Sequence, residues 1–363
     1  MGRSMRGRFS GVVRYTDELV RALAARGDVD LTVLLTRAAD GLDGVPTRRL
    51  RAPFPTPNEY VRALWEQAFV PVAVSRLRPD VYHSPNYILP LALRCPTVLT
   101  IHDFAYRERA LHRLRSHLYL SVLADLSIRK ATRIICVSEA THEELLRRYP
   151  AAAAKARVIG EGVHARFRPR HDAVERFRAR YRIRRPYVLF VGTIEPRKNL
   201  ARLIQAFDAL LARTAAPHEL ILVGQRGWKD GPVWEAFRDS PNRDRIRSLG
   251  YVDDEELPAA YSGADAFVYP SIHEGFGLPV LEAMACGAPV LTSSVSSLPE
   301  VAGDAAVLVD PLDAEALTCG LARLVCDASE RRRFAAAGLE RAARFRWDQV
   351  AQRTLAVYAE VAA

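Results

Sequence analysis

Short apolar runs alternate with longer amphipathic segments along most of the chain. Apolar runs bounded by polar residues or glycine predict buried strands. Such runs occur at 29–36, 81–84, 97–101, 133–137, 187–191, 219–223, 264–269, 290–292 and 306–309. Helical spacing of apolar residues occurs at 12–25, 109–131, 139–149, 200–211, 254–262 and from 314 to 361. Strands that alternate with helices are typical of α/β proteins, in which helices cover both faces of a parallel sheet.

The alternation occurs in two series, separated by a charged and irregular stretch at His164–Arg185. The sequence therefore predicts two doubly wound domains of similar size, residues 1–170 and 171–345, that face each other across a cleft. Ligands of such domains bind at the carboxyl ends of the strands. The last predicted helix runs from Trp347 to Val361.

The start of the first series is irregular. A doubly wound domain usually opens with a strand that leads into its first glycine turn. Here the turn-like segment Gly7–Gly11 has only six residues before it, and they do not resemble a strand. Either the first strand is missing from this chain, or the true start lies upstream.

Composition narrows the class of protein. The chain has 363 residues, of which 49% are hydrophobic and 26% charged, as in a globular protein of two domains. No apolar run is long enough to predict a membrane span, and Met1–Ser10 lacks the apolar core of a secretory signal. The five cysteines are scattered without metal-site or CxxC spacing, which predicts reduced thiols in a cytoplasmic protein.

The net charge of +10 comes largely from arginines spread along the chain. Nucleic-acid binding would favour a concentrated basic stripe with interleaved aromatic residues, and the sequence has none. A cationic surface that approaches anionic lipid or a polyanionic acceptor fits the charge better. Solvated helix faces in an arginine-rich protein explain it equally well.

The segment Ser271–Glu282 contains a glycine turn between the predicted strand at 264–269 and a predicted helix at Pro279–Cys286. Free N–H groups and the positive end of the helix dipole make such a turn an anion site. Glu274 and Glu282 flank the turn. Carboxylates at these places are often merely solvated, but two beside an anion site indicate a ligand with phosphate and hydroxyl groups, such as a nucleotide sugar.

A second glycine turn, Gly192–Asn199, also lies between a predicted strand and a predicted helix. Its Arg197 and Lys198 would neutralise a diphosphate as the bond to a sugar breaks. Alone, the segment would be interpreted as an ordinary basic loop. Its place at the end of a strand in the same domain as Glu274 favours the phosphate-binding interpretation.

His102 ends a predicted strand of the first domain, within Thr100–Asp103. A histidine there can hold a sugar hydroxyl or a phosphate oxygen, but a strand-end histidine bound only by backbone is an equal alternative. Ser138 is predicted to be the N-cap of the helix at 139–149, with Thr141 as an alternative cap.

At these residues the chain resembles the retaining glycosyltransferases of the GT-B fold, in the large family 4 that includes bacterial α-mannosyltransferases. Glu274 and Glu282 match its E-x7-E motif, within HEGFGLPVLEAMACGAPV. GTIEPRKN matches a phosphate-binding signature of one branch, and TIHD, VSE and the segments 161–167 and 250–253 match further landmarks. The resemblance covers nearly the whole chain and implies that a last helix, 346–363, crosses back onto the first domain.

The resemblance also implies a role for each site residue. Glu282 is expected to bind the ribose hydroxyls, and Glu274 to contact the donor sugar. Arg197 and Lys198 are expected to bind the diphosphate. The amides of the glycine turn would help them, and these belong to Phe276, Gly277 and Leu278.

The remaining expected contacts come from both domains. The backbone at Tyr251 and Val252 would hold the base, and Gly192 would lie at the donor site. From the first domain, His102 would line the sugar site across the cleft, and Gly11 would bring its amide near the phosphates. Such enzymes need no metal, so neither a metal nor a cofactor is expected, and Asp253-Asp254 is interpreted as a helix cap.

Three positions depart from the family pattern. Many relatives have an arginine where this chain has Thr193, and Arg197 is the candidate substitute. A common Asn-Gly-Val-Asp is here Glu161-Gly-Val-His164, which removes the family's Asp. The first strand is apparently absent, which puts the position of Gly11 in question.

Together these features predict transfer of a sugar, best mannose from GDP-mannose, to a lipid-linked or polysaccharide acceptor in surface glycan synthesis. The enzyme is expected in the cytoplasm, at the inner face of the cell membrane. Three alternatives stay open: a UDP-sugar-dependent enzyme of the same fold, a catalytically inactive nucleotide-sugar-binding protein, and a dinucleotide-dependent oxidoreductase. The oxidoreductase would require a G-x-G-x-x-G after the first strand, which the sequence lacks.

Overall fold

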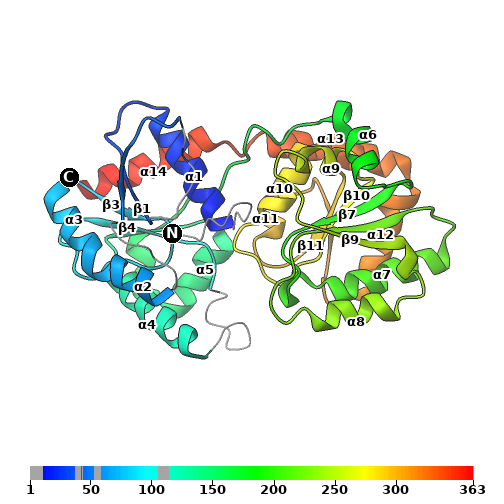
Figure 1. The fold of residues 1–363 in the computed structure, drawn as a ribbon, viewed down its shortest axis with the longest axis horizontal. Helices are drawn as coiled ribbons and strands as arrows, with labels where there is room; N and C mark the ends of the chain where they lie inside the picture. Colours follow the sequence, from blue (N-terminus) through cyan, green and yellow to red (C-terminus); the bar gives the residue numbers. More distant parts are fainter. Residues whose placement is uncertain (1–10, 37–41, 43, 53–58, 105–113, 363) are drawn as a thin grey trace. The chain divides into compact units, whose positions relative to one another are not determined.

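A computed structural model describes residues 11–36, 42, 44–52, 59–104 and 114–362 of the chain. The chain divides into two compact units (Figure 1), and each is described by itself below. The first unit comprises residues 1–162 and 346–363, and the second comprises residues 163–345. Residues 163–170 thus belong to the second unit, where Phe167 packs edge-to-face against Tyr261, with ring centroids 6.1 Å apart.

The first unit contains a parallel four-stranded sheet in the order β3-β4-β5-β6. Its strands are β3 (Tyr82–Ser84), β4 (Thr97–Ile101), β5 (Arg133–Cys136) and β6 (Ala156–Val158). All five residues of β4 are buried, two threonines among them, as in a central strand of a parallel sheet. The connecting elements are α4 (Leu114–Lys130), α5 (Glu139–Arg148) and the 3₁₀ turn η3 (Pro150–Lys155).

A second, two-stranded parallel sheet in this unit pairs β1 (Thr32–Leu35) with β2 (Arg48–Arg51). Helix α1 (Gly11–Ala24) precedes it, with Tyr15, Leu19 and Leu23 on its buried face. After β2 the chain forms one continuous helical run that contains a π-helical turn. This run consists of α2 (Glu59–Leu64), η1 (Trp65–Phe69) and α3 (Val70–Leu77).

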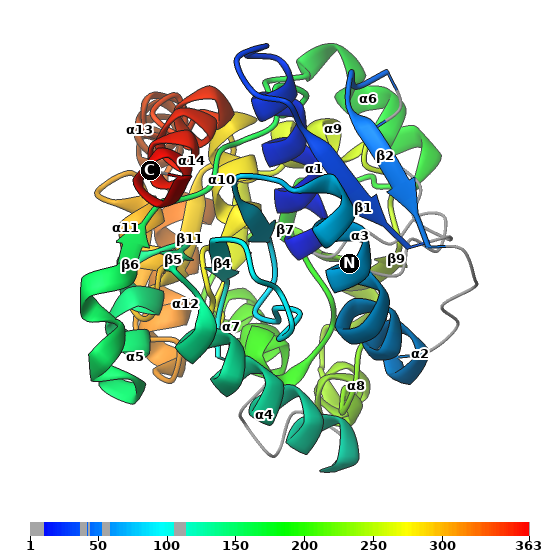
Figure 2. The same ribbon diagram turned by 90° about the vertical axis from the view of Figure 1, so that its left-hand side faces the viewer.

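Helix α14 (Trp347–Ala362) packs against α1 and β4 of the first unit, as Figures 1 and 2 show, so the predicted return of the last helix is confirmed. The hydroxyl oxygen of Tyr358 and Nδ1 of His83 are 2.6 Å apart, within hydrogen-bonding distance. Burial and the nearby His102 lower the pKa of His83 to about 3, so its ring is neutral. A neutral hydrogen bond inside the packed unit therefore helps to hold the chain terminus.

The second unit contains a six-stranded parallel sheet in the order β12-β11-β10-β7-β8-β9. Its strands are β7 (Tyr187–Val191), β8 (Glu219–Val223), β9 (Ile246–Gly250), β10 (Ala266–Tyr269), β11 (Val290–Ser293) and β12 (Val307–Val309). One layer of helices contains α7 (Leu200–Arg213), α8 (Gly231–Asp239) and α12 (Ala314–Cys326). The opposite layer contains α6 (His171–Arg180), α9 (Leu257–Ser262), α10 (Leu278–Ala285) and α13 (Ala328–Ala342) (Figure 1).

The strand order fixes where this unit binds ligands. The sheet grows from β7 to β8 and β9 on one side, and then from β10 to β12 on the other. Loops after β7 and β10 therefore diverge at the point of reversal, which is where ligands bind in such sheets. Beside this point the ends of β7 and β8 approach closely, since a Cβ on Gly224, whose φ is +139°, would lie 1.9 Å from the carbonyl oxygen of Gly192.

Several elements differ from the sequence-based expectations. The stretch His164–Arg185 is not irregular throughout, because α6 forms within it around the buried Phe177. Strands β2, β6 and β9 and helices α2, α3, α8 and α11 (Leu298–Ala302) were not predicted. The glycine turn at 7–11 and the apparently missing first strand concern residues before Gly11, which lie outside the described residues. In the described chain, no helix is long and apolar enough to cross a membrane.

Candidate active site

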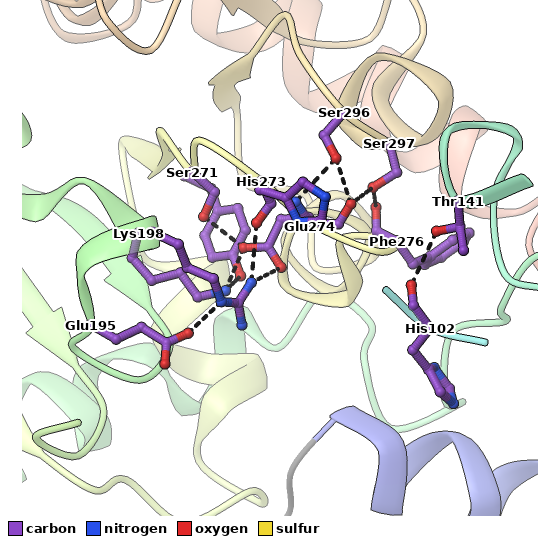
Figure 3. A network of polar contacts seen from close by, with 12 residues as sticks. His102, Thr141, Glu195, Lys198, Ser271, His273, Glu274, Phe276, Ser296 and Ser297 are labelled. Carbon is purple, nitrogen blue, oxygen red and sulfur yellow. Dashed lines mark hydrogen bonds and ion pairs between the residues drawn. The ribbon is translucent and has the colours of Figure 1, made fainter. Parts of the chain in front are cut away.

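Glu274 lies at the centre of a cluster of polar side chains in the second unit (Figure 3). It follows β10, while Arg197 and Lys198 follow β7 in the 3₁₀ turn η4 (Pro196–Lys198). Arg197 Nη1 donates to Glu274 Oε2 at 2.7 Å, and Lys198 Nζ donates to Oε1 at 2.5 Å. The two glycine turns that the sequence singled out thus meet at the reversal point of the sheet.

Two further side chains hold this ion-paired group. Ser271 Oγ donates to Glu274 Oε1 at 2.6 Å, and Lys198 Nζ also donates to the hydroxyl of Tyr269. Tyr269 stacks on Phe190, with ring centroids 5.8 Å apart. The ammonium and the carboxylate are therefore fixed by neighbours that the sequence analysis did not assign, although Tyr269 and Ser271 lie within two residues of each other before the turn.

The protonation of Glu274 follows from these contacts. Burial favours the neutral acid, but Lys198 and Arg197 outweigh burial and lower the pKa of Glu274 to about 2. Because the pKa is lowered, the pair stabilises the fold above about pH 4.5 and loses this effect only as the pH falls towards 2. Glu274 is therefore ionised at neutral pH, and lone pairs of its Oε2 can accept a ligand hydroxyl as well as the guanidinium.

Arg197 is also paired with a second carboxylate. Its Nε lies 2.5 Å from Glu195 Oε1, and Trp228 Nε1 donates to Glu195 Oε2 at 3.3 Å. Glu195 therefore orients the guanidinium of Arg197 from one side, and Glu274 binds it from the other. Glu195 was not among the predicted site residues, although it lies within the same GTIEPRKN signature.

Hydroxyl groups hold the glycine turn after β10. Ser297 Oγ donates to the carbonyls of Glu274 and Phe276, at 3.0 and 2.7 Å, and Ser296 accepts from the amide of Glu274 at 3.1 Å (Figure 3). Gly277 has φ +116°, a conformation that favours glycine. Side chains of the loop that follows β11 thus fix the conformation of this turn.

The turn leads directly into α10. Gly277 is the N-cap residue, and no side chain caps the helix. Within the described chain, the amides of Phe276, Gly277 and Leu278 donate to no protein acceptor. Such amides at the positive end of a helix favour an anion, as a diphosphate is.

Glu282 lies on α10 and is buried, with 2% of its surface exposed. Tyr261, on α9, donates its hydroxyl to Glu282 Oε2 at 3.2 Å. The tyrosine thus orients the carboxylate predicted to bind ribose. Tyr261 was not predicted, because only the fold brings α9 and α10 together.

The other predicted donor residues lie at neighbouring strand ends. Gly192 follows β7, and Tyr251 and Val252 follow β9, two strands away in the same sheet. Tyr251 is partly exposed and Val252 is buried. Asp253 and Asp254 do not cap α9, whose N-cap residue is Glu256.

In the first unit, His102 follows β4 and is bound through both ring nitrogens. Nδ1 lies 3.2 Å from Glu161 Oε1, and Nε2 lies 3.0 Å from the carbonyl oxygen of Pro85. Thr141 donates its hydroxyl to the carbonyl of His102 at 3.0 Å (Figure 3). Two acceptors facing the two nitrogens suit a doubly protonated imidazolium.

The other first-unit expectations have separate outcomes. Ser138 caps α5 as predicted, since its Oγ accepts from the amide of Thr141 at 3.0 Å. Gly11 begins α1, and a Cβ there would meet no atom within 4 Å. A larger side chain would therefore fit at this position. In the described chain, no group of three or more His, Cys, Asp or Glu side chains could hold a metal ion.

We expect Glu161→Gln to lower the pKa of His102. Burial lowers the pKa of His102, but the hydrogen bond and charge of Glu161 raise it above its ordinary value near 6.5. The pair therefore stabilises the fold fully below about pH 6.5, and this effect is lost as the pH rises through the raised pKa. Nuclear magnetic resonance titration of the ring protons measures the pKa of His102 in the unsubstituted protein and in Glu161→Gln.

His83 provides an internal control for this titration. Its pKa is lowered to about 3, so its ring should stay neutral in both proteins across the neutral range. A His102 ring that titrates below pH 6.5 in the unsubstituted protein, or equally in both proteins, contradicts the assignment of Glu161.

Comparison with known proteins agrees with this fold. A family model described as "Glycosyl transferases group 1" matches residues 173–341, and one described as "Glycosyltransferase Family 4" matches residues 9–167. The O-antigen chain mannosyltransferase B of Escherichia coli is 32% identical over 369 residues, which cover 96% of this chain and 96% of that protein.

Solved structures show the same fold. Sucrose-phosphate synthase from Thermosynechococcus elongatus superposes with a TM-score of 0.78 at 24% identity, over 97% of this chain and 93% of that one. Anabaena HepE in complex with UDP-glucose superposes with a TM-score of 0.77 at 18% identity, over 98% and 97% of the two chains.

The parallel sheets, the reversal-point site and these matches define a sugar-transferring enzyme of the GT-B fold. The chain belongs to the family 4 glycosyltransferases. The resemblance inferred from the sequence and the predicted fold class are both confirmed. The roles of individual site residues stay predictions.

Proposed function

We propose that the protein transfers mannose from GDP-mannose to a growing lipid-linked or polysaccharide acceptor, with retention of configuration at the anomeric carbon. One observation carries the donor half of this proposal. Glu274 is held between Arg197, Lys198 and Ser271 at the strand ends of the second unit. Cations for a diphosphate and a carboxylate for sugar hydroxyls thus meet beside the N-terminus of α10.

Each group has a role that follows from its position. Arg197 and Lys198 stabilise the charge that develops on the diphosphate as its bond to the sugar breaks. The amides of Gly277 and Leu278 bind phosphate oxygens at the positive helix end. Glu274 accepts a hydroxyl of the sugar, and Glu282, oriented by Tyr261, accepts the ribose hydroxyls.

Retention is proposed to occur by attack on the face from which the diphosphate departs. The bond between the anomeric carbon and the diphosphate oxygen breaks, and the acceptor oxygen forms its bond on the same side. The acceptor proton passes to an oxygen of the departing phosphate. The protein then contributes positioning and charge stabilisation, and neither a metal nor a cofactor takes part.

Mannose is favoured because the relative that matches the chain over almost its full length is named a mannosyltransferase. A UDP-sugar is the second candidate donor. It is favoured by the structural similarity to Anabaena HepE, which was solved in complex with UDP-glucose. The acceptor is proposed to be a glycan precursor at the inner face of the cell membrane.

A panel of nucleotide sugars tests the donor. GDP-mannose is expected to raise the melting temperature more than UDP-glucose or ADP-glucose does at equal concentration, because ligands that bind only the folded state stabilise it. At a concentration about 100-fold above Kd, the stabilisation is about 2.7 kcal/mol. A larger shift with UDP-glucose would replace the proposed donor, and no shift with any of them would contradict the proposed function.

A further inference from the structure

The first unit has a surface groove between β2 and the helical run α2–η1–α3. Two adjoining hollows form it and share Leu50, Ala73 and Arg76. Strand β2 is an edge strand of the two-stranded sheet, and the helical run follows it in the chain (Figure 2). We call this surface the β2–α3 groove and define it by Arg48, Leu50, Arg51, Val72, Ala73 and Arg76.

Apolar side chains are exposed along the helical run beside the groove. Leu64 is 57% exposed, Phe69 is 45% exposed and Val72 is 49% exposed. Phe69 ends the π-helical turn η1, and Phe69 and Val72 both line one hollow of the groove. Exposed apolar side chains that gather on one surface usually mark an interaction site.

Positive charge surrounds the apolar side chains. Arg48, Arg51 and Arg76 line the groove, and all three are exposed. Residues 48–51 and 59–78 contain six arginines and two acids, Glu59 and Glu66, and Glu66 lies 3.7 Å from Arg62. Asp80 follows just beyond this stretch. The apolar surface therefore has a strongly basic border.

We propose that the β2–α3 groove and the exposed side of α2–η1–α3 dock on the surface of an anionic lipid bilayer. Apolar side chains enter the boundary between headgroups and acyl chains, while the arginines bind lipid phosphates. The inference rests on the proposed function in that a lipid-linked acceptor lies in such a bilayer. It identifies the part of the chain that meets the membrane.

Charge favours a bilayer over the other occupants of such a surface. In a symmetric contact between two copies of the chain, arginines would face arginines across the interface, which costs free energy. Single-stranded nucleic acid stacks successive bases on several exposed aromatic rings, whereas among the side chains described on this surface Trp65 is buried and only Phe69 exposes an aromatic ring. A bilayer offers both the negative phosphates and the apolar layer that the surface matches.

Flotation with vesicles tests the proposal on the full chain. Vesicles of phosphatidylcholine alone are compared with vesicles that also contain about 30% phosphatidylglycerol, at about 0.1 M and 0.5 M salt. The protein is expected to float with the anionic vesicles at low salt and to be released at high salt. Arg48→Glu with Arg76→Glu is expected to weaken binding about thirtyfold or more, and Leu64→Ser with Val72→Ser to weaken it severalfold.

Matched controls come from the second unit. Leu312 is 59% exposed and Arg332 is exposed. Leu312→Ser and Arg332→Glu should therefore leave vesicle binding unchanged. The proposal would be overturned if the groove variants and these controls lost vesicle binding equally. It would also be overturned if the unsubstituted protein did not bind anionic vesicles at low salt. Sedimentation showing that the groove variants separate a dimer into monomers while vesicle binding persists would overturn it as well.

Calorimetry of the same preparations separates this inference from the proposed function. The groove variants should bind nucleoside diphosphate as the unsubstituted protein does, because the candidate donor site belongs to the second unit. Nucleotide binding without vesicle binding refutes only the docking surface. Vesicle binding that depends on the groove, without transfer from any nucleotide sugar, refutes only the proposed function.

Discussion

Turnover of the donor is expected to fall about a thousandfold when Glu274 is replaced by glutamine. Glutamine keeps the size of the side chain but removes the charge that holds Arg197 and Lys198. Alanine should abolish transfer as well. It would also remove the oxygen that accepts from the buried Lys198, whereas the amide oxygen of glutamine can still accept, and breaking a buried pair outright typically costs about 3–5 kcal/mol of stability. Glutamine is therefore the sharper test, and kcat at saturating donor is the measurement.

The control for this variant is Glu340→Gln, on the exposed side of α13. It removes one carboxylate from the same unit and should leave both kcat and the melting temperature unchanged. Near-normal turnover in Glu274→Gln, with a folded protein, would exclude Glu274 from the reaction. A similar loss in Glu340→Gln would show that the effect is only one of net charge.

Combined replacement of Arg197 by alanine and Lys198 by methionine is expected to weaken binding of nucleoside diphosphate at least a hundredfold. Each charge-assisted hydrogen bond to phosphate contributes about 1.5–3 kcal/mol. Methionine keeps the apolar stem of the buried Lys198, which reduces the loss of packing. Titration calorimetry with GDP and UDP measures the change directly, without requiring an acceptor.

Arg238→Ala is the matched control, because Arg238 is an exposed arginine of α8 in the same unit. It should bind the nucleotides normally. Unchanged affinity in the double variant would refute the diphosphate clamp. A lower kcat with unchanged affinity would show that both cations stabilise the transition state and do not contribute to binding of the donor.

The sequence alone predicted the strands that are buried at every position. Strands such as β4, β7 and β8 are buried at every position, so their apolar runs identified them without knowledge of the fold. Their order and connections placed the two glycine turns at one end of one sheet. That is why Glu274, Arg197 and Lys198 were predicted together and are found in contact.

Elements with few apolar residues were missed. Strand β2 has the sequence Arg-Arg-Leu-Arg, with no buried position, so neither alternation nor an apolar run identifies it. Helix α6 has a single buried side chain, Phe177, among charged residues. Both form because a neighbouring element supplies the packing, and single-sequence periodicity does not contain that information.

Supporting side chains of the site were missed for a different reason. Ser296, Ser297 and Tyr261 contact the carboxylate turn or Glu282 from segments about twenty residues away in sequence. Glu161 was recognised only as a departure from a family pattern, yet it pairs with His102. Serine, tyrosine and glutamate are common residues, and only tertiary contacts distinguish these from the rest.

The candidate donor site holds its two cations already matched by two carboxylates. Glu195 and Glu274 balance Arg197 and Lys198, so these four side chains have no formal net charge. Under the proposed function, the spent nucleoside diphosphate has more negative charge than the donor once it loses the proton taken from the acceptor. Because Glu195 and Glu274 offset the two cations, the site binds this product less tightly than the cations alone would, which favours its release.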